Sequence, residues 1–236
     1  MGLMERKISI CIPTYQRFEM LFEAFAKVYD DPRVDEIVIV DDTSELDIFE
    51  KIRERSFAME KIKLYRNANN RDCYLNKYTS LSFAQNDWCI LLDSDNIIDV
   101  DYLDKIFGFD EWDEKTSYMP SFAKPLFNYS ALSCYTLCKE NMYEMIRLHM
   151  ADTMLNCCNY FVNRHEYMKV WQPDINPHTA DSILQNYNWF MAGNKMLVVP
   201  GLEYFHRVHP GSYYQNNNHL TGNLYNEILE KLKAMK

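Results

Sequence analysis

The sequence predicts an α/β protein whose core is a doubly wound, mostly parallel sheet within a single domain. Apolar, β-branched runs alternate with helix-like segments through about the first hundred residues, which is typical of repeated strand–helix–strand units. The runs at residues 36–40 and 88–92 are mainly apolar, as expected for strands buried on both faces of a sheet. Polar turns follow three of the runs, at the place where open α/β sheets bind their ligands.

The first half of the chain accounts for most of this pattern. A strand is predicted at residues 7–12, where β-rich residues alternate and Pro13 ends the run. A helix is predicted at residues 17–29, because apolar side chains recur there at helical spacing. The other elements of this half are strands at residues 36–40, 61–65 and 88–92 and helices at residues 45–55 and 74–85.

The second half is less regular. Residues 115–135 contain scattered aromatic residues and two prolines, and we assign no strand or helix to them. A helix is predicted at residues 179–192, ended by Gly193 in the manner of a C-cap. The remaining elements are helices at residues 139–150 and 224–235, the second of them amphipathic, and strands at residues 160–162 and 195–199.

The composition excludes several classes of protein. With 236 residues, 47% of them hydrophobic, the chain is long enough for one large domain with a sizeable core. A formal net charge of −9 argues against nucleic acid as the main partner, because that role needs a basic surface. We expect no membrane span and no signal peptide, since no apolar run approaches roughly 20 residues. Seven cysteines without C-x-x-C spacing favour a reduced, cytoplasmic setting.

Asp93, Ser94 and Asp95 directly follow the apolar run at residues 88–92. Two carboxylates therefore leave the end of a buried strand together, where they would repel each other without a cation. A divalent ion that also holds a phosphate would resolve the repulsion, and hard oxygen ligands favour Mg²⁺ or Mn²⁺ over zinc. If the strands are parallel, the turns at residues 13–17 and 41–44 lie at the same sheet edge. One nucleotide could then touch all three turns.

These motifs resemble those of the family 2 glycosyltransferases, which have the GT-A fold. The resemblance is carried, in the family's order and spacing, by residues 8–17, 37–44, 91–95, 179–181, 192–193 and 206–212. It implies an enzyme of polysaccharide biosynthesis that transfers a sugar from a nucleotide donor, usually UDP-linked, with inversion at the anomeric carbon. The implied acceptor is a saccharide or a lipid-linked saccharide. A nucleotide-binding half (1–110), an acceptor-binding half (111–220) and a C-terminal helix (221–236) would make up the domain.

The resemblance also implies roles for individual residues. Asp42 would bind the nucleobase, and Asp93 would bind the ribose or the metal ion. Asp95 would be the main ligand of Mn²⁺ or Mg²⁺, and His209, or as second choice His206, would complete the metal shell. The implied nucleotide-binding residues are Pro13, Thr14, Tyr15, Arg17, Asp42, Arg71, Asp93, Ser94 and Arg207, the last of them near the diphosphate.

Asp181 matches the family's catalytic base. A glycosyl acceptor must lose its hydroxyl proton as it attacks, and one well-placed carboxylate accelerates that step by about 10²–10⁴-fold. Ala180 stands where the family usually has an acidic residue, and Ser182 could equally occupy the register of the base. Asp181 as an ordinary helix N-cap residue is the competing interpretation.

Two turns depart from the family pattern. Thr43 stands where the family usually has glycine. Residues 67–72 replace a turn that usually contains glycine, and we expect an asparagine there to take the left-handed conformation.

Three other functions compete with sugar transfer. A phosphohydrolase of the haloacid-dehalogenase type also has D-x-D after an apolar strand, but its pattern requires Thr or Val where this chain has Ile97. A phospho-acceptor receiver domain would be about half this length and would begin one strand and one helix later. A nucleotide-sugar-binding protein without catalysis is compatible with Ala180. A cytoplasmic location, with contact at the inner membrane face, would suit a lipid-linked acceptor.

Overall fold

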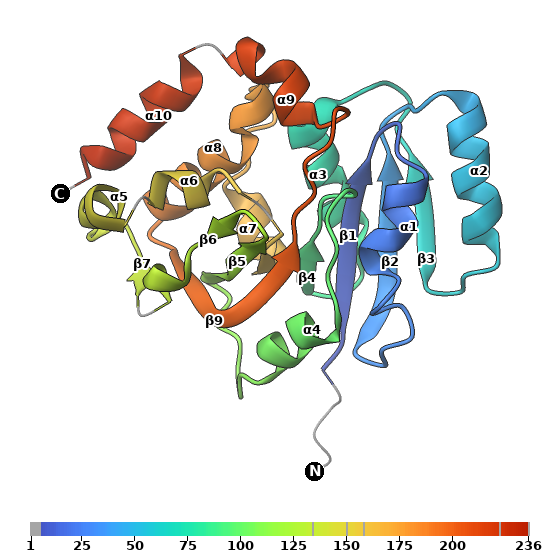
Figure 1. The fold of residues 1–236 in the computed structure, drawn as a ribbon, viewed down its shortest axis with the longest axis horizontal. Helices are drawn as coiled ribbons and strands as arrows, with labels where there is room; N and C mark the ends of the chain where they lie inside the picture. The colour runs from blue at the N-terminus through green and yellow to red at the C-terminus, as the bar shows by residue number, and fades with distance from the viewer. Residues whose placement is uncertain (1–5, 134, 150, 158, 222, 236) are drawn as a thin grey trace.

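The computed structural model describes residues 6–133, 135–149, 151–157, 159–221 and 223–235 (Figure 1). Within these ranges the centre is a nine-stranded sheet with strand order β3-β2-β1-β4-β8-β5-β9-β7, and β6 pairs with β5. Helices cover both faces of the sheet. The predicted doubly wound α/β architecture is therefore confirmed, with a mixed sheet in which the first four strands are parallel.

The first half of the chain forms the parallel part of the sheet. Its elements are β1 (Ile8–Thr14), α1 (Glu19–Phe25), β2 (Val34–Asp41), α2 (Leu46–Phe57), β3 (Ile62–Arg66), α3 (Asp72–Phe83), β4 (Trp88–Leu91) and α4 (Val100–Phe107). Alternation along β1 explains the two-sided burial. Ile10 and Ile12 pack into one core cluster with α1, α2 and α4, whereas Cys11 packs into the opposite cluster with α3.

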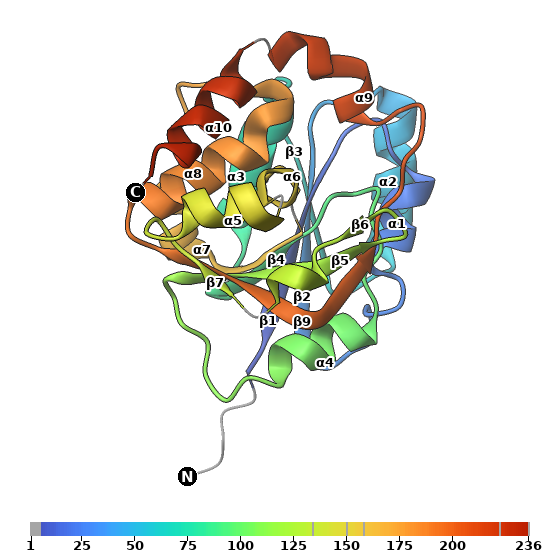
Figure 2. The ribbon, with the colours of Figure 1, turned by 60° about the vertical axis from the view of Figure 1, so that its left-hand side comes forward.

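The second half extends the sheet with both strand directions. Its longer elements are β5 (Thr116–Lys124), α5 (Met142–His149), β8 (Phe161–Asn163), α7 (Arg164–Lys169), α8 (Asp181–Met191), β9 (Lys195–Phe205) and α10 (Leu224–Lys233). The shorter ones are β6 (Phe127–Asn128), η1 (Ser130–Leu132), β7 (Thr136–Leu137), α6 (Ala151–Leu155), η2 (His178–Ala180), α9 (Tyr213–Asn217) and η3 (Asn218–Thr221). β8 runs antiparallel to β4 and β5, whereas β9 runs parallel to β5. The amphipathic helix α10 packs beside α8 and α5 (Figure 2).

Pro13 does not end the first strand, contrary to the sequence prediction. The strand continues to Thr14, and Pro13 is paired with Val40 of β2. The carbonyl of Cys11 accepts a hydrogen bond from the chain that follows β4, so the amide position of Pro13, two residues later, faces the same side. β4 has already ended there, and the proline removes no hydrogen bond from the ladder.

The segment at residues 115–135, to which the sequence assigns no element, contains the long central strand β5. Eight of its residues pair with β9, and a bulge interrupts the register between Pro120 and Phe122. Almost every side chain of this strand is buried, so polar and apolar residues do not alternate along it. Its proline falls at the bulge, where a strand tolerates one.

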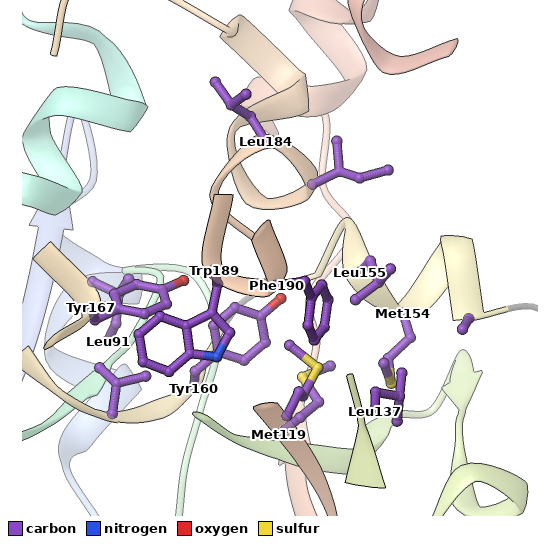
Figure 3. Close-up of a cluster of buried hydrophobic side chains, with 14 of the residues drawn as sticks. Leu91, Met119, Leu137, Met154, Leu155, Tyr160, Tyr167, Leu184, Trp189 and Phe190 are labelled. Atoms are coloured by element: carbon purple, nitrogen blue, oxygen red, sulfur yellow. The ribbon is translucent and has the colours of Figure 1, made fainter. Parts of the chain in front are cut away.

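Trp189 lies in the core. It is fully buried, and its indole N–H donates to the carbonyl of Lys195 at 2.6 Å. Figure 3 shows it beside Phe190, Tyr160 and Tyr167 in the cluster between α8 and the sheet. The predicted C-cap of this helix is also present, because Gly193 has a φ of +81° and donates to the carbonyl of Phe190.

Each of the two turns that depart from the family pattern contains a residue with a left-handed backbone. Thr43 has a φ of +64°, the left-handed conformation that favours glycine. In the turn at residues 67–72 the left-handed residue is Asp72, with a φ of +63°, so the expectation of an asparagine was wrong. Asp72 tolerates this conformation because its short side chain accepts a hydrogen bond from the amide of Cys73.

Among the residues described by the structure, no helix combines the length and the apolar character required to cross a bilayer.

Candidate active site

A cavity of about 1040 Å³ opens at the carboxyl ends of β1, β2 and β4. Its wall contains the turns after these strands, the first part of α3, the start of α8 and the segment after β9. The ionisable side chains along it, tyrosines and cysteines aside, are Arg17, Asp42, Asp72, Lys77, Asp93, Asp95, Asp181, Arg207 and the imidazoles of His178, His206 and His209. The three polar turns therefore meet in one hollow, as the parallel strand order requires.

The turn after β1 is fixed to the turn after β2. Gln16 has a φ of +55°, and its amide donates to the hydroxyl of Ser44 at 2.8 Å. Pro13, Thr14 and Tyr15 line the cavity, and 48% of the surface of Tyr15 is exposed. An exposed aromatic ring at this position is suited to stacking on a nucleotide base.

The adjacent carboxylates of Asp41 and Asp42 have different surroundings. Asp41 is fully buried and accepts a hydrogen bond from the amide of Ser44, which holds the turn. Asp42 lines the cavity and accepts from the side chain of Asn67 at 2.7 Å and the amide of Arg71 at 2.8 Å. Burial raises the pKa of Asp42, although these hydrogen bonds oppose the change. Only Asp42 is therefore available to a ligand.

Asp95 is the point where the side chains of Arg17 and His209 converge. Its Oδ2 lies 3.1 Å from a guanidinium nitrogen of Arg17 and 3.1 Å from Nε2 of His209. Arg17 also donates to the hydroxyl of Ser94 at 3.3 Å and to the carbonyl of Gly211. The turn after β4 is thus linked to the turn after β1 and to the segment after β9.

Asp181 begins α8 and points its carboxylate at Lys77 of α3. The Nζ of Lys77 donates to Oδ2 of Asp181 at 2.6 Å and lies 3.4 Å from Oδ1 of Asp93. The N-cap position of the helix is Ala180, which makes no side-chain cap hydrogen bond. The N-cap interpretation of Asp181 is therefore wrong. Ser182, the alternative position for the base, also lines the cavity.

The segment after β9 brings two histidines and an arginine to the cavity. His206 is stacked edge-on against Phe127, and burial lowers its pKa even though Asp93 and Asp95 lie nearby. Arg207 lines the cavity and pairs with Glu23 of α1 at 2.7 Å. His209, not His206, contacts the metal candidate Asp95.

Arg71 is the one predicted nucleotide-binding residue whose side chain turns away from the cavity. Its guanidinium donates to the hydroxyl of Thr79 on α3, and only its amide reaches Asp42. Sequence reasoning missed Lys77, which is 7% exposed. The signal was available, because Lys77 lies three residues after the buried Tyr74 and so shares the apolar stripe of its helix.

The family resemblance implies a divalent ion, and the donor set fits one. Oδ2 of Asp95 and Nε2 of His209 converge within 3.1 Å of each other at the cavity wall. Among the described residues no group of three or more His, Cys, Asp and Glu side chains forms a candidate metal site of its own. Two protein ligands suit an ion that takes its remaining ligands from phosphate oxygens and water, as Mg²⁺ commonly does.

Comparison with known families decides the identity. A model of Glycosyl transferase family 2 matches residues 9–171, well over half of the chain. The chain belongs to glycosyl transferase family 2. The matched region contains the three strand-end turns, Lys77 and most of the sheet, while Asp181 and His209 lie beyond it. No curated protein matches the chain.

Solved structures confirm the GT-A fold of this family 2 chain. Residues 1–349 of S. aureus TarS superpose with a TM-score of 0.67 at 16% identity, covering 94% of this chain and 65% of TarS 1–349. The complex of the same TarS fragment with UDP-GlcNAc gives a TM-score of 0.71 at 16% identity, with 96% and 65% coverage. The mannosyltransferase PcManGT from Pyrobaculum calidifontis gives 0.65 at 15% identity, again with 96% and 65% coverage. The chain thus spans just under two thirds of these relatives.

Proposed function

We propose that the chain is an inverting glycosyltransferase that moves a sugar from a nucleotide-diphosphate donor to a hydroxyl of a saccharide or lipid-linked saccharide. The observation that carries the proposal is the meeting of Asp42, Asp95 and Asp181 around one cavity at the strand ends. In this cavity Asp42 could bind a nucleobase, Asp95 could bind a metal ion, and Asp181 could accept the proton of the acceptor hydroxyl. Family membership supports the reaction class.

The donor would lie across the three strand-end turns. Asp42 would accept a hydrogen bond from a base N–H, beside the ring of Tyr15, and Asp93 would face the ribose. Arg17 and Arg207 would pair with the diphosphate. Two relatives support a nucleotide-sugar donor, since TarS has been solved with UDP and UDP-GlcNAc and PcManGT with GDP-Man and Mn²⁺. We favour UDP on the resemblance of the turns.

Sugar transfer with inversion would proceed by a single displacement at the anomeric carbon. Asp181 would take the proton of the acceptor hydroxyl as its oxygen attacks the anomeric carbon. The bond from that carbon to the phosphate oxygen breaks, and its electron pair stays on the leaving diphosphate. Arg17 and Arg207 would neutralise that charge. Asp95 and His209 would hold Mn²⁺ or Mg²⁺, which when bound supplies Lewis-acid stabilisation of the same diphosphate.

The two halves of the domain would bind different substrates. Residues 1–110 would bind the donor, residues 111–220 would bind the acceptor, and residues 221–236 would close the domain with a C-terminal helix. We also propose action in the cytoplasm, at the inner membrane face where the acceptor is lipid-linked.

The first experiment is thermal unfolding with UDP, GDP, dTDP and CDP, each with and without Mn²⁺. Binding to the native state alone raises stability by about 2.7 kcal/mol at a hundredfold excess over Kd. We expect a Mn²⁺-dependent shift with one nucleotide, lost in Asp95→Ala. Asp181→Asn should retain the shift and lose transfer, and NMR of the product should show the inverted anomer. No shift with any nucleotide would refute the proposal, and transfer by Asp181→Asn would move the base elsewhere.

A further inference from the structure

Lys77 is a buried cation in the wall of the cavity, shared by two carboxylates to which the proposed function gives different roles. It lies on α3, one turn after Cys73, and only 9% of its side chain is exposed. Its Nζ lies 2.6 Å from Asp181, at the start of α8, and 3.4 Å from Asp93, after β4. These three residues come from three separate elements, so the contact exists only in the folded chain.

The physical reason for a cation here is the density of negative charge. Asp93 and Asp181 are both largely shielded from water, with 28% and 11% of their side chains exposed. Without a shared counter-ion, two carboxylates that approach one point in such surroundings would repel each other. A lysine is almost never this deeply buried unless it is paired. The ammonium group of Lys77 thus holds both carboxylates at one point of the cavity wall through ion pairs.

We propose that Lys77 is a positioning residue for the sugar transfer, an inference that rests on the proposed function. Its ammonium group fixes the carboxylate of Asp181 at the cavity wall, so that one oxygen bonds to Lys77 and the other is directed at the acceptor. Through Asp93 the same cation links the base to the donor side of the cavity. Lys77 acts through these two carboxylates and takes no proton itself.

The structure also indicates why another residue does not supply this function. Arg17 is engaged with Asp95 and Ser94, and Arg207 with Glu23. Of the cations that line the cavity among the described residues, Lys77 is the one that forms an ion pair with Asp181. Cys73 lies on the same helical face and donates its thiol to the carbonyl of His178, three residues before Asp181. The first half of α3 therefore fixes both the backbone before Asp181 and its carboxylate.

The test compares Lys77→Gln, which keeps a hydrogen-bond donor without the charge, with Lys77→Arg, which keeps the charge. The probes are UDP-GlcNAc, UDP-glucose and GDP-mannose with Mn²⁺, and the readout is nucleotide release with water or added saccharide as acceptor. We expect kcat of Lys77→Gln to fall about a hundredfold, the lower range for general-base catalysis, with donor KM unchanged within about threefold. Lys77→Arg should recover at least a tenth of the wild-type kcat.

The matched control is Lys51→Gln, which removes the charge of an exposed lysine that pairs with Asp47 on α2. It should leave kcat and KM at wild-type values. Thermal unfolding and calorimetric UDP binding show whether each variant is folded. A Lys77→Gln enzyme with wild-type kcat, an effect confined to KM, or equal loss in Lys77→Gln and Lys77→Arg would overturn the role of Lys77. Absence of nucleotide release by the wild-type protein would instead overturn the proposed function.

Discussion

The guanidinium group of Arg17 lies 3.1 Å from Oδ2 of Asp95, the same carboxylate oxygen that Nε2 of His209 approaches at 3.1 Å. Both partners of this ion pair are largely buried, with 16% and 12% of their side chains exposed. Arg17 therefore competes with any metal ion for this oxygen. A metal bound to Asp95 would release Arg17, which is then available to the diphosphate. Metal and nucleotide are expected to assist each other through this exchange.

Arg17→Met should separate the two ligands. Loss of the competing cation should tighten Mn²⁺ binding measured without nucleotide. UDP affinity measured at saturating Mn²⁺ should fall about tenfold, because the released guanidinium is then lost from the diphosphate and a hydrogen bond to a charged group contributes about 1.5–3 kcal/mol. Calorimetry measures both affinities, and Arg53→Met, at an exposed arginine paired with Glu50 on α2, is the control. Weaker binding of both ligands would contradict the exchange.

The two histidines after β9 should differ in their effect on metal binding. His209 contacts Asp95, whereas His206 packs edge-on against Phe127 and Tyr204, with a pKa lowered by burial. His209→Ala should weaken Mn²⁺-dependent UDP binding about tenfold or more, the effect typical of perturbed metal sites. His206→Ala should change it by less than about threefold, with calorimetry at fixed Mn²⁺ as the measurement. The reverse order would assign the metal to His206.

Asp42→Asn should stabilise the fold and weaken nucleotide binding. Burial raises the pKa of Asp42, so its ionised form is disfavoured in the folded state. The contribution of Asp42 to folding stability is fully present below its unfolded pKa of about 3.9. It is lost as pH rises through the higher pKa that Asp42 has in the folded state. The variant should therefore unfold at a higher temperature than wild type at pH 7, and the difference should shrink towards pH 4.

The side-chain carbonyl that Asp42→Asn introduces can still accept from Asn67 and Arg71, so the turn is expected to keep its hydrogen bonds. Asp47→Asn, on exposed α2, is the control for removing one charge. A variant less stable than wild type at pH 7 would show that the carboxylate stabilises the turn.

Thr43→Gly should raise stability. A left-handed backbone costs an L-residue roughly 1–2 kcal/mol, which glycine does not incur. Glycine loses more conformational entropy on folding, which costs about half to 1 kcal/mol. The expected net gain in stability is about half to 1 kcal/mol. For a chain of this size that corresponds to about 2 °C in Tm. Thr43→Ala keeps the Cβ atom and should not stabilise. Equal midpoints for wild type and the glycine variant would argue against strain at this φ of +64°.

The candidate site was predictable from the sequence wherever its residues follow an apolar strand. Asp93 and Asp95 come directly after β4, and Asp42 directly after β2, so local pattern and parallel order suffice to bring them to one edge. The split between Asp41 and Asp42 also follows from the two-residue period of a strand, although the sequence does not say which of the two faces the cavity.

Contacts between distant elements were not predictable in the same way. Lys77 and Asp181 are 104 residues apart, and neither helix carries a local signal for the other. Likewise, β5 shows no alternation because both of its faces are buried, and its partner β9 lies some eighty residues later. β8 lies between β4 and β5 in the sheet and runs antiparallel to both, so β5 and β9 join the sheet on its far side.

Local sequence patterns were enough to predict the α/β class, the parallel first half, and the acidic turns of a family 2 glycosyltransferase. These depend on short-range periodicity and on which residues follow a buried strand. The tertiary structure alone decided that Lys77 joins Asp93 to Asp181, that Arg17 and His209 share one oxygen of Asp95, and that Arg71 turns away. Such pairings are set by burial, because a charge removed from water must find its partner among whatever distant elements the packed sheet brings within reach.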